Sequence, residues 1–144
     1  MRRFDLSFRV RHPVMAAEDV CAQIGMKAKT AWTAGANRRS PSGQELPGKY
    51  EETYCSFPLD ARDDETIADC LYRHATELHR RVADLQMLTR SGGELEFFVG
   101  WYMEKNDGEV LAAPLMTLLS RINAGVSLDV YPGPLRQREA PSKG

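Results

Sequence analysis

The sequence predicts an α+β fold, a two-layer sandwich in which helices cover one face of a mostly antiparallel sheet of about five strands. Some segments alternate apolar and polar residues with a period of two, and others repeat apolar residues every three or four positions. The length of 144 residues and the hydrophobic content of 42% are typical of one globular domain. We expect the order β-α-β-α-β-β-α-β, and the alternative is a ferredoxin-like split β-α-β with an added strand.

The first elements are a strand, a short helix and a long loop. Residues 3–11 alternate apolar and polar side chains, which predicts a half-buried strand that ends at His12-Pro13. Residues 15–24 carry apolar side chains four positions apart and predict a helix that Gly25 ends. Residues 26–48 have no sustained period and contain several glycines and prolines. Since so long a loop in a compact domain usually has a function, it is the first place to look for a site.

The middle of the chain predicts a second strand and a long helix. The strand is expected over residues 50–57, closed by Pro58 because proline cannot donate to a strand ladder. Acidic residues then precede an amphipathic pattern over residues 64–89. A helix of that length is about 39 Å long at 1.5 Å per residue. We therefore expect it to bend near residues 76–80.

The last third of the chain predicts three more strands and a helix. Residues 94–103 form the clearest alternating pattern, and Asn106-Asp107-Gly108 predicts a hairpin turn into a short strand over 109–112. Proline suits the first turn of a helix over 114–123, and residues 126–131 alternate again.

The predicted elements lead to a domain division and to a core. We expect a single α+β domain over residues 1–134 and a flexible tail over residues 135–144, which has no apolar pattern. The inward positions of the elements form the predicted core: Phe4, Leu6, Phe8, Val10, Ile67, Leu71, Leu78, Phe97, Val99, Trp101, Leu118, Ile122, Leu128 and Val130.

Several short motifs occur in a fixed order along the chain. They are Ile24-Gly25-Met26, Ala31-Trp32-Thr33-Ala34-Gly35, Arg38-Arg39 with Gly43 after it, and the ending Gly-Val-Ser-Leu-Asp-Val-Tyr at 125–131. On these motifs the sequence resembles the domain-of-unknown-function 4279 family of bacterial proteins over residues 3–132. One departure is Tyr54, where the family pattern has a tryptophan. The resemblance implies the fold and a single domain, and it carries no activity.

No recognised catalytic or cofactor motif stands out. Cys70 and His74 are four residues apart but lie beside the apolar stripe of the long helix, and no Cys-x-x-Cys or His-Glu-x-x-His spacing occurs. There is no Gly-x-Ser-x-Gly elbow and no phosphate-binding glycine loop. The acidic cluster at 60–65 is explained by the N-terminus of the helix that follows it. The sequence thus favours a non-enzymatic role with no cofactor and no metal.

The termini and the cysteines indicate the cellular compartment in which the protein is expected. The first residues contain no apolar stretch of the kind that a signal peptide has, and no segment approaches the roughly 18 consecutive apolar residues of a membrane span. The three cysteines are unevenly spaced, which is typical of reduced, buried thiols. We therefore expect a cytoplasmic protein without a membrane partner.

Charge is distributed unevenly although the net charge is −1. Residues 1–49 carry nine basic and four acidic residues, and residues 50–144 carry ten basic and sixteen acidic ones. This separation of basic from acidic residues favours a charged partner. A net charge close to zero, however, argues against nucleic acid as that partner.

The leading hypothesis is a non-enzymatic protein that binds another macromolecule, in the manner of an immunity or inhibitor protein. The alternative is a binder of a small anionic ligand, or an enzyme, that uses the 26–48 loop over the open face of the sheet. Either partner would be held by Trp32, Arg38 and Arg39 of the loop and by Tyr102 of the sheet, because aromatic rings and guanidinium groups suit such contacts. The oligomeric state is left open.

Overall fold

The computed structural model describes residues 3–133, so the expected tail at 135–144 lies outside the described residues. Four helices and seven strands follow one another as β1 (Phe4–His12), α1 (Ala17–Ile24), β2 (Thr30–Trp32), β3 (Asn37–Arg39), β4 (Glu45–Lys49), β5 (Thr53–Leu59), α2 (Ile67–His79), α3 (Val82–Arg90), β6 (Glu94–Met103), α4 (Ala113–Arg121) and β7 (Ala124–Pro132).

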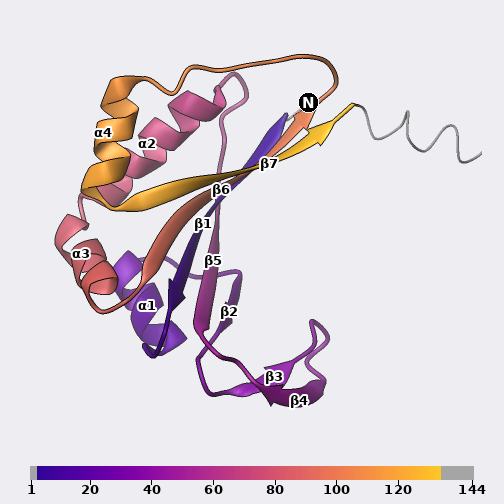
Figure 1. Ribbon diagram of the computed structural model, residues 1–144, viewed down its shortest axis with the longest axis vertical. Coiled ribbons are helices and arrows are strands. Elements are labelled where there is room, and N and C mark those ends of the chain that lie inside the picture. The colour runs from indigo at the N-terminus through magenta and orange to yellow at the C-terminus, as the bar shows by residue number, and fades with distance from the viewer. Residues whose placement is uncertain (1–2, 134–144) are drawn as a thin grey trace, which may run out of the picture.

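The predicted α+β class is confirmed. Five strands form one sheet in the order β2-β5-β1-β6-β7, and β3 and β4 form a separate two-stranded hairpin. Every neighbouring pair in the large sheet is antiparallel except β6 and β7, which are parallel and are connected through α4. All four helices lie on one side of the sheet, and the hairpin projects from the end near β2 (Figure 1). Because β6 and β7 are direct neighbours, the split β-α-β alternative is wrong.

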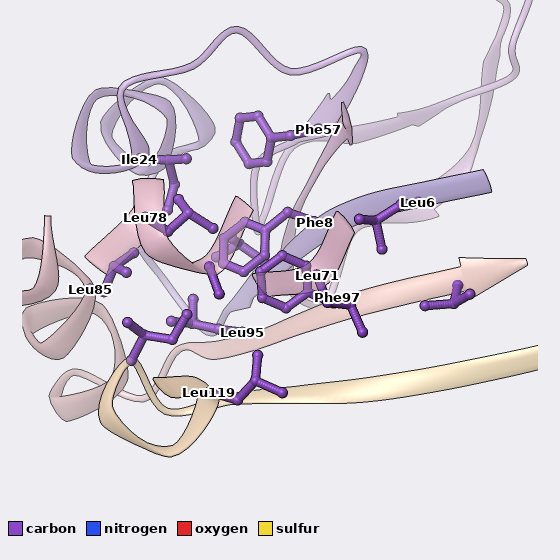
Figure 2. Packing of buried hydrophobic residues seen from close by; sticks show 14 of the residues in the cluster. Leu6, Phe8, Ile24, Phe57, Leu71, Leu78, Leu85, Leu95, Phe97 and Leu119 are labelled. Atoms are coloured by element: carbon purple, nitrogen blue, oxygen red, sulfur yellow. The ribbon is translucent and has the colours of Figure 1, made fainter. Parts of the chain in front are cut away.

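Alternation in β1 and β6 places a row of large side chains under the helices. Phe8 is fully buried, and its ring centre lies 5.0 Å from that of Phe97 and 6.5 Å from that of Phe57. Leucines and isoleucines of the helices close over these rings (Figure 2). Each such side chain removes enough apolar surface from water to contribute about 1.5–3 kcal/mol to folding. The core therefore lies between the helices and one face of the sheet.

The long amphipathic segment forms two helices, as the expected bend suggests. α2 ends at His79 and α3 begins at Val82, so the break falls at Arg80 and Arg81. Arg81 Nη1 donates to the carbonyl oxygen of Gln23, 3.3 Å away, near the end of α1. The break thus lets α2 pack against α4 while α3 packs against α1 and β6.

The predicted hairpin at residues 106–108 is wrong. Residues 105–112 have no regular structure, so no strand covers 109–112 and the expected β-β step of the element order is absent from the described residues. Asp107 accepts a hydrogen bond from Arg3, and the Glu109 carboxylate accepts from the backbone N–H groups of Ile67 and Ala68, 2.9 and 2.8 Å away. These long-range contacts compete with the local turn preference and hold the segment over the N-terminus of α2.

The expected long loop at 26–48 contains three short strands. β2 pairs with β5 at the edge of the sheet, while β3 and β4 pair with each other. Strands of three to five residues leave no measurable alternation in a sequence, since long-range hydrogen bonds define them. Pro58 also lies inside β5 rather than after it, opposite Ser7. Its missing N–H is tolerated because β2 extends along β5 only as far as Ser56.

Two predicted core residues are exposed. The side chains of Leu128 and Val130 are 51% and 41% accessible to solvent, although they lie on the helix side of β7. β7 is an edge strand, and on its helix side burial decreases from the partly buried Ala124 and Val126 to the exposed Leu128, Val130 and Pro132. The prediction failed there because alternation identifies a face of a strand without showing how far the helices extend over it. Leu118, also predicted for the core, is only partly buried.

Candidate functional site

The face of the sheet opposite the helices, here called the bare face, carries polar and aromatic side chains. Its members are the alternate residues of β1, β5 and β6 that point away from the core: Asp5, Ser7, Arg9, Arg11, Tyr54, Ser56, Pro58, Glu94, Glu96, Phe98 and Tyr102. Pairing in the central strands places residues of β5 and β6 on either side of each arginine of β1. The bare face is therefore an ordered array and not a set of scattered surface groups.

Two arginines of β1 stack on aromatic rings of the neighbouring strands. The guanidinium carbon of Arg9 lies 3.7 Å from the ring centre of Phe98, and that of Arg11 lies 4.9 Å from the ring centre of Tyr54. Cation–π contacts of this kind contribute about 0.5–1 kcal/mol at an exposed site. They also hold the two long side chains flat, so that little conformational entropy is left to lose on binding.

Trp32 anchors the hairpin to the sheet. Its ring lies 4.7 Å from the ring centres of both Tyr50 and Tyr54, and the planes of Trp32 and Tyr50 differ by only 10°. Tyr54 belongs to β5 and Tyr50 follows β4, so the contact joins the two sheets. A large apolar ring is costly to leave in water, and the indole packs on these two tyrosines. Gly35 adopts a left-handed turn conformation, with φ of +82°, which glycine tolerates without strain.

Beneath the hairpin lies a concave region of about 750 Å³, here called the hairpin cleft. Its lining comes from the end of β1 and the start of β6, from β2, and from β3, β4 and the turn that follows β4. The lining is Arg11, His12, Pro13, Trp32, Arg38, Gly48, Lys49, Tyr50, Glu51, Glu52, Gly92 and Glu94. This volume lies in the usual range for binding sites in proteins.

The charges in the hairpin cleft are balanced. Three cationic residues (Arg11, Arg38 and Lys49) share its lining with three glutamates. Arg11 donates to the Glu52 carboxylate at 3.1 Å, which neutralises part of the positive charge. A purely anionic ligand would meet carboxylates as well as cations there. The cleft therefore suits a partner that presents charges of both signs.

Only two of the four predicted site residues line this cleft. Trp32 and Arg38 are part of it, and the Arg38 guanidinium donates to the Pro47 carbonyl at 3.3 Å. Arg39 is held within the hairpin by the Gly43 carbonyl at 3.2 Å and by Glu45 at 3.9 Å.

Tyr102 lies at the other end of the bare face. β6 runs from Glu94 at the cleft to Met103, so Tyr102 is nearly a whole strand away from it. Its ring stacks on Tyr131 at 5.1 Å, and its hydroxyl donates to Asp5 at 2.9 Å. The hydrogen bond to this carboxylate raises the pKa of the Tyr102 phenol. The structure thus places Tyr102 apart from Trp32 and Arg38 and does not bring it to the cleft.

Residues outside the prediction complete the site. Arg11, Lys49, Tyr50 and Tyr54 line the cleft or stack beside it. The alternation of β1 already places Arg9 and Arg11 on the outward face, so that signal was available in the sequence. The tyrosines gave no such signal, because only the pairing of β5 with β2 brings them to Trp32.

His12 lies in the floor of the cleft, but its hydrogen bonds are structural. Its Nδ1 accepts from the backbone N–H groups of Val14 and Met15, 3.1 and 2.9 Å away, so the proton must be on Nε2. Nε2 then donates to Ser91 Oγ at 2.8 Å, and Ser91 donates to the Met87 carbonyl at 2.9 Å. His12 cannot act as the base that activates Ser91, because the nitrogen facing the hydroxyl carries a proton and has no free lone pair to accept another.

The thiol and imidazole of α2 are likewise used in packing. Cys70 Sγ and His74 Nε2 both contact the carbonyl oxygen of Asp60, at 3.5 and 2.7 Å. Burial raises the pKa of the Cys70 thiol to about 12, which disfavours the thiolate that an electrophile would need. Over residues 3–133, no group of three or more histidine, cysteine or acidic side chains could hold a metal ion.

None of the helices within residues 3–133 combines the length and the apolar character needed to cross a membrane. Comparisons of this protein with family models, with curated proteins and with solved structures give no match.

Proposed function

We propose that this protein is a non-enzymatic binding protein that engages another protein through the hairpin cleft and the adjoining bare face. One observation carries the proposal: stacked tryptophan, tyrosine and arginine side chains lead across the sheet into a concave site of about 750 Å³ with charges of both signs. Tryptophan, tyrosine and arginine are the residue types most enriched at the energetic centres of protein interfaces.

Preorganisation supports a tight, inhibitor-like mode of binding. Trp32, Tyr50 and Tyr54 are stacked before any partner arrives, and Arg11 is held by both Tyr54 and Glu52. Side chains that are ordered in advance lose little entropy on association, which favours high affinity at moderate interface size. The immunity- or inhibitor-type role expected from the sequence fits this arrangement.

Acidic residues on the same face argue against nucleic acid. Glu94 and Glu96 lie directly opposite Arg11 and Arg9 in the pairing of β6 with β1. A phosphate backbone approaching the arginines would meet these carboxylates as well. A protein partner can place an opposite charge against each arginine and each glutamate, so the mixed pattern favours a protein.

A small anionic ligand is the second candidate, because Arg38 and Lys49 project into the cleft beside Trp32. Titration with inorganic phosphate and with acetate, followed by the indole N–H resonance of Trp32, separates this candidate from the first. A saturable shift that Arg38→Ala removes would favour the small ligand and would count against a purely protein-binding role.

The main experiment locates the partner on the surface. A photocrosslinking amino acid is placed at Thr30, an exposed residue of β2 beside the aromatic cluster of Trp32, Tyr50 and Tyr54. As a control it is placed at Tyr72, which is exposed on α2. In extract from the native host we expect one protein to crosslink from Thr30 and not from Tyr72. Equal crosslinking from both positions, or from neither, would overturn the proposal.

Neighbouring arginines of the hairpin provide a matched pair of variants. Arg38→Ala removes a cation from the cleft, whereas Arg39→Ala removes one that contacts the hairpin alone. Both are surface changes and should alter the free energy of unfolding by no more than about 0.5 kcal/mol. Crosslinking from Thr30 should fall strongly in Arg38→Ala and stay nearly unchanged in Arg39→Ala, and the reverse order would contradict the assignment of the cleft.

A further inference from the structure

The two edges of the five-stranded sheet are built differently. The β2 edge has only three residues, and Pro58 interrupts the donors of β5 beyond it. Short edge strands and prolines are the usual means by which proteins prevent edge-to-edge pairing. The β7 edge has nine residues and carries no lysine, no arginine and no proline before Pro132. One edge is thus protected and the other is not.

β7 also presents unsatisfied groups and apolar surface. Among the described residues its backbone pairs with β6 alone, so alternate N–H and C=O groups along its outer edge have no strand to bond to. Leu128 and Val130 stand exposed on the helix side of this strand. β7 is an edge strand of the sheet, and in Figure 1 its C-terminal end extends away from the helices. An edge of this length and polarity is a template for another strand.

We propose that β7 pairs antiparallel with β7 of a second copy of this chain, about a twofold axis that passes by Leu128. The occupant follows from the pattern of β7 itself, which is self-complementary about that residue. On the helix side, Leu128 faces Leu128 of the partner subunit, and Val126 faces Val130 of the partner subunit. Apolar cross-strand pairs of this kind stabilise a sheet and would cover the two exposed side chains.

The opposite side of the strand is equally complementary in this register. Ser127 faces Asp129 of the partner subunit, so a hydroxyl donor meets each carboxylate. Tyr131 faces Gly125 of the partner subunit, and the space above Gly125 is open, since a side chain there would meet no atom within 4 Å. The Tyr131 ring can therefore keep its stack on Tyr102 in this register, because Gly125 of the partner subunit has no side chain to clash with it.

Other registers are less favourable for physical reasons. A shift by one residue turns the apolar face of one copy against the polar face of the other. Moving the axis to Asp129 places two carboxylates directly opposite each other, which is destabilising. Moving it to Ser127 leaves Tyr131 beyond the end of the partner's strand, since β7 begins at Ala124. Of the registers centred on Ser127, Leu128 and Asp129, the one at Leu128 matches size, charge and face together.

This dimer has a defined geometry. Matching of the faces places the twofold axis perpendicular to the sheet, so the two five-stranded sheets join into one of ten strands. Both bare faces then lie on the same side, with the hairpins at opposite ends. The pairing does not depend on the proposed binding function, because it involves the edge of the sheet and not the hairpin cleft.

Mass measurement on the full-length chain is the first test. Sedimentation equilibrium at about 100 µM should give twice the monomer mass of 16.2 kDa if the dissociation constant is micromolar. Leu128→Lys places two like charges at the axis and should give the monomer mass at the same concentration. Because Leu128 is half exposed, a lysine there should leave the fold of the subunit intact. The variant should therefore unfold at the same thermal midpoint as the parent chain diluted to its monomeric form. A monomeric parent chain, or a dimer that persists in Leu128→Lys, would overturn the proposal.

Disulfide trapping tests the register. Leu128→Cys places the two introduced thiols opposite each other at the axis, whereas Val130→Cys places them four residues apart along the paired strands. Both positions are exposed on the same side of β7, so chemical reactivity is matched. Under mild oxidation we expect a covalent dimer from Leu128→Cys in at least tenfold greater yield, with the parent chain as the control for its own three cysteines. Equal yields, or more from Val130→Cys, would exclude this register.

Discussion

Phe97 and Phe98 are neighbours in β6 with opposite surroundings. Phe97 is fully buried against Phe8, whereas Phe98 lies on the bare face beneath the Arg9 guanidinium. Phe97→Ala should lower the free energy of unfolding by about 3–5 kcal/mol, because it leaves a cavity in a packed core. Phe98→Ala should cost far less. Denaturant unfolding measures both, and a loss below about 1 kcal/mol for Phe97→Ala would mean that the faces of the strand are reversed.

His12 makes the stability of the protein sensitive to pH. Burial lowers the pKa of this imidazole below its ordinary value of 6.5, and its Nδ1 accepts two backbone hydrogen bonds that protonation would break. The unfolded chain therefore binds more protons than the folded one as the pH falls through the ordinary pKa. The contribution of neutral His12 is present above that pH and is lost below it.

We predict that the free energy of unfolding falls between pH 7 and pH 5, and that His12→Gln reduces this fall. Denaturant titrations at a series of pH values give the two slopes. The difference between parent and variant isolates His12 from the other titrating groups. Parallel slopes in the two proteins would show that His12 is not the group responsible.

At the scale of elements, the N-terminus of α2 depends on a residue far away in sequence. The Thr66 hydroxyl oxygen accepts from the Asp69 backbone N–H, and the Glu109 carboxylate accepts from the two N–H groups before it in the helix. A negative charge at this position also opposes the positive end of the helix dipole. The irregular segment 104–112 is thus a structural clamp for α2 and not merely a connection to α4.

Glu109→Ala should cost about 0.5–2 kcal/mol of unfolding free energy, as removal of a helix cap does. Amide hydrogens of the first turn of α2 should also exchange faster, which nuclear magnetic resonance can follow residue by residue. Glu77→Ala is the matched control, because Glu77 is an exposed carboxylate in the same helix and contacts only Arg80 at the surface, 3.6 Å away. A control that costs as much as Glu109→Ala would contradict the capping role.

Across the whole molecule, the hairpin and the core are connected through the aromatic cluster. Trp32 belongs to β2, which pairs with β5, and β5 in turn pairs with the central strand β1. Trp101, the other tryptophan of the chain, is buried at the end of β6. We therefore predict that the two tryptophans report one cooperative unfolding transition.

Trp101→Phe and Trp32→Phe each leave a single fluorescent indole to observe. In each variant the thermal midpoint from fluorescence should coincide with the midpoint from far-ultraviolet circular dichroism. This internal comparison removes any difference in stability between the variants. If Trp32 loses its native signal well before the secondary structure melts, the hairpin is a separate unit and the cleft opens independently of the core.

The sequence was sufficient for those features that depend on local periodicity. β1 and β6 were predicted within one residue because their side chains alternate over nine and ten positions. α2 and α3 were predicted as one bent helix, since the apolar stripe continues through the break at Arg80 and Arg81. Trp32 and Arg38 were found from residue type and from their place in a long segment without periodicity.

Only the tertiary structure decided which long-range partners each segment has. β2, β3 and β4 are defined by hydrogen bonds between distant residues, and the turn signal at 106–108 is overridden by the contacts of Arg3 and Glu109. Arg39 and Tyr102 leave the predicted site because pairing and stacking hold them elsewhere. Leu128 is exposed because burial depends on what covers a face, which no repeat within a strand encodes.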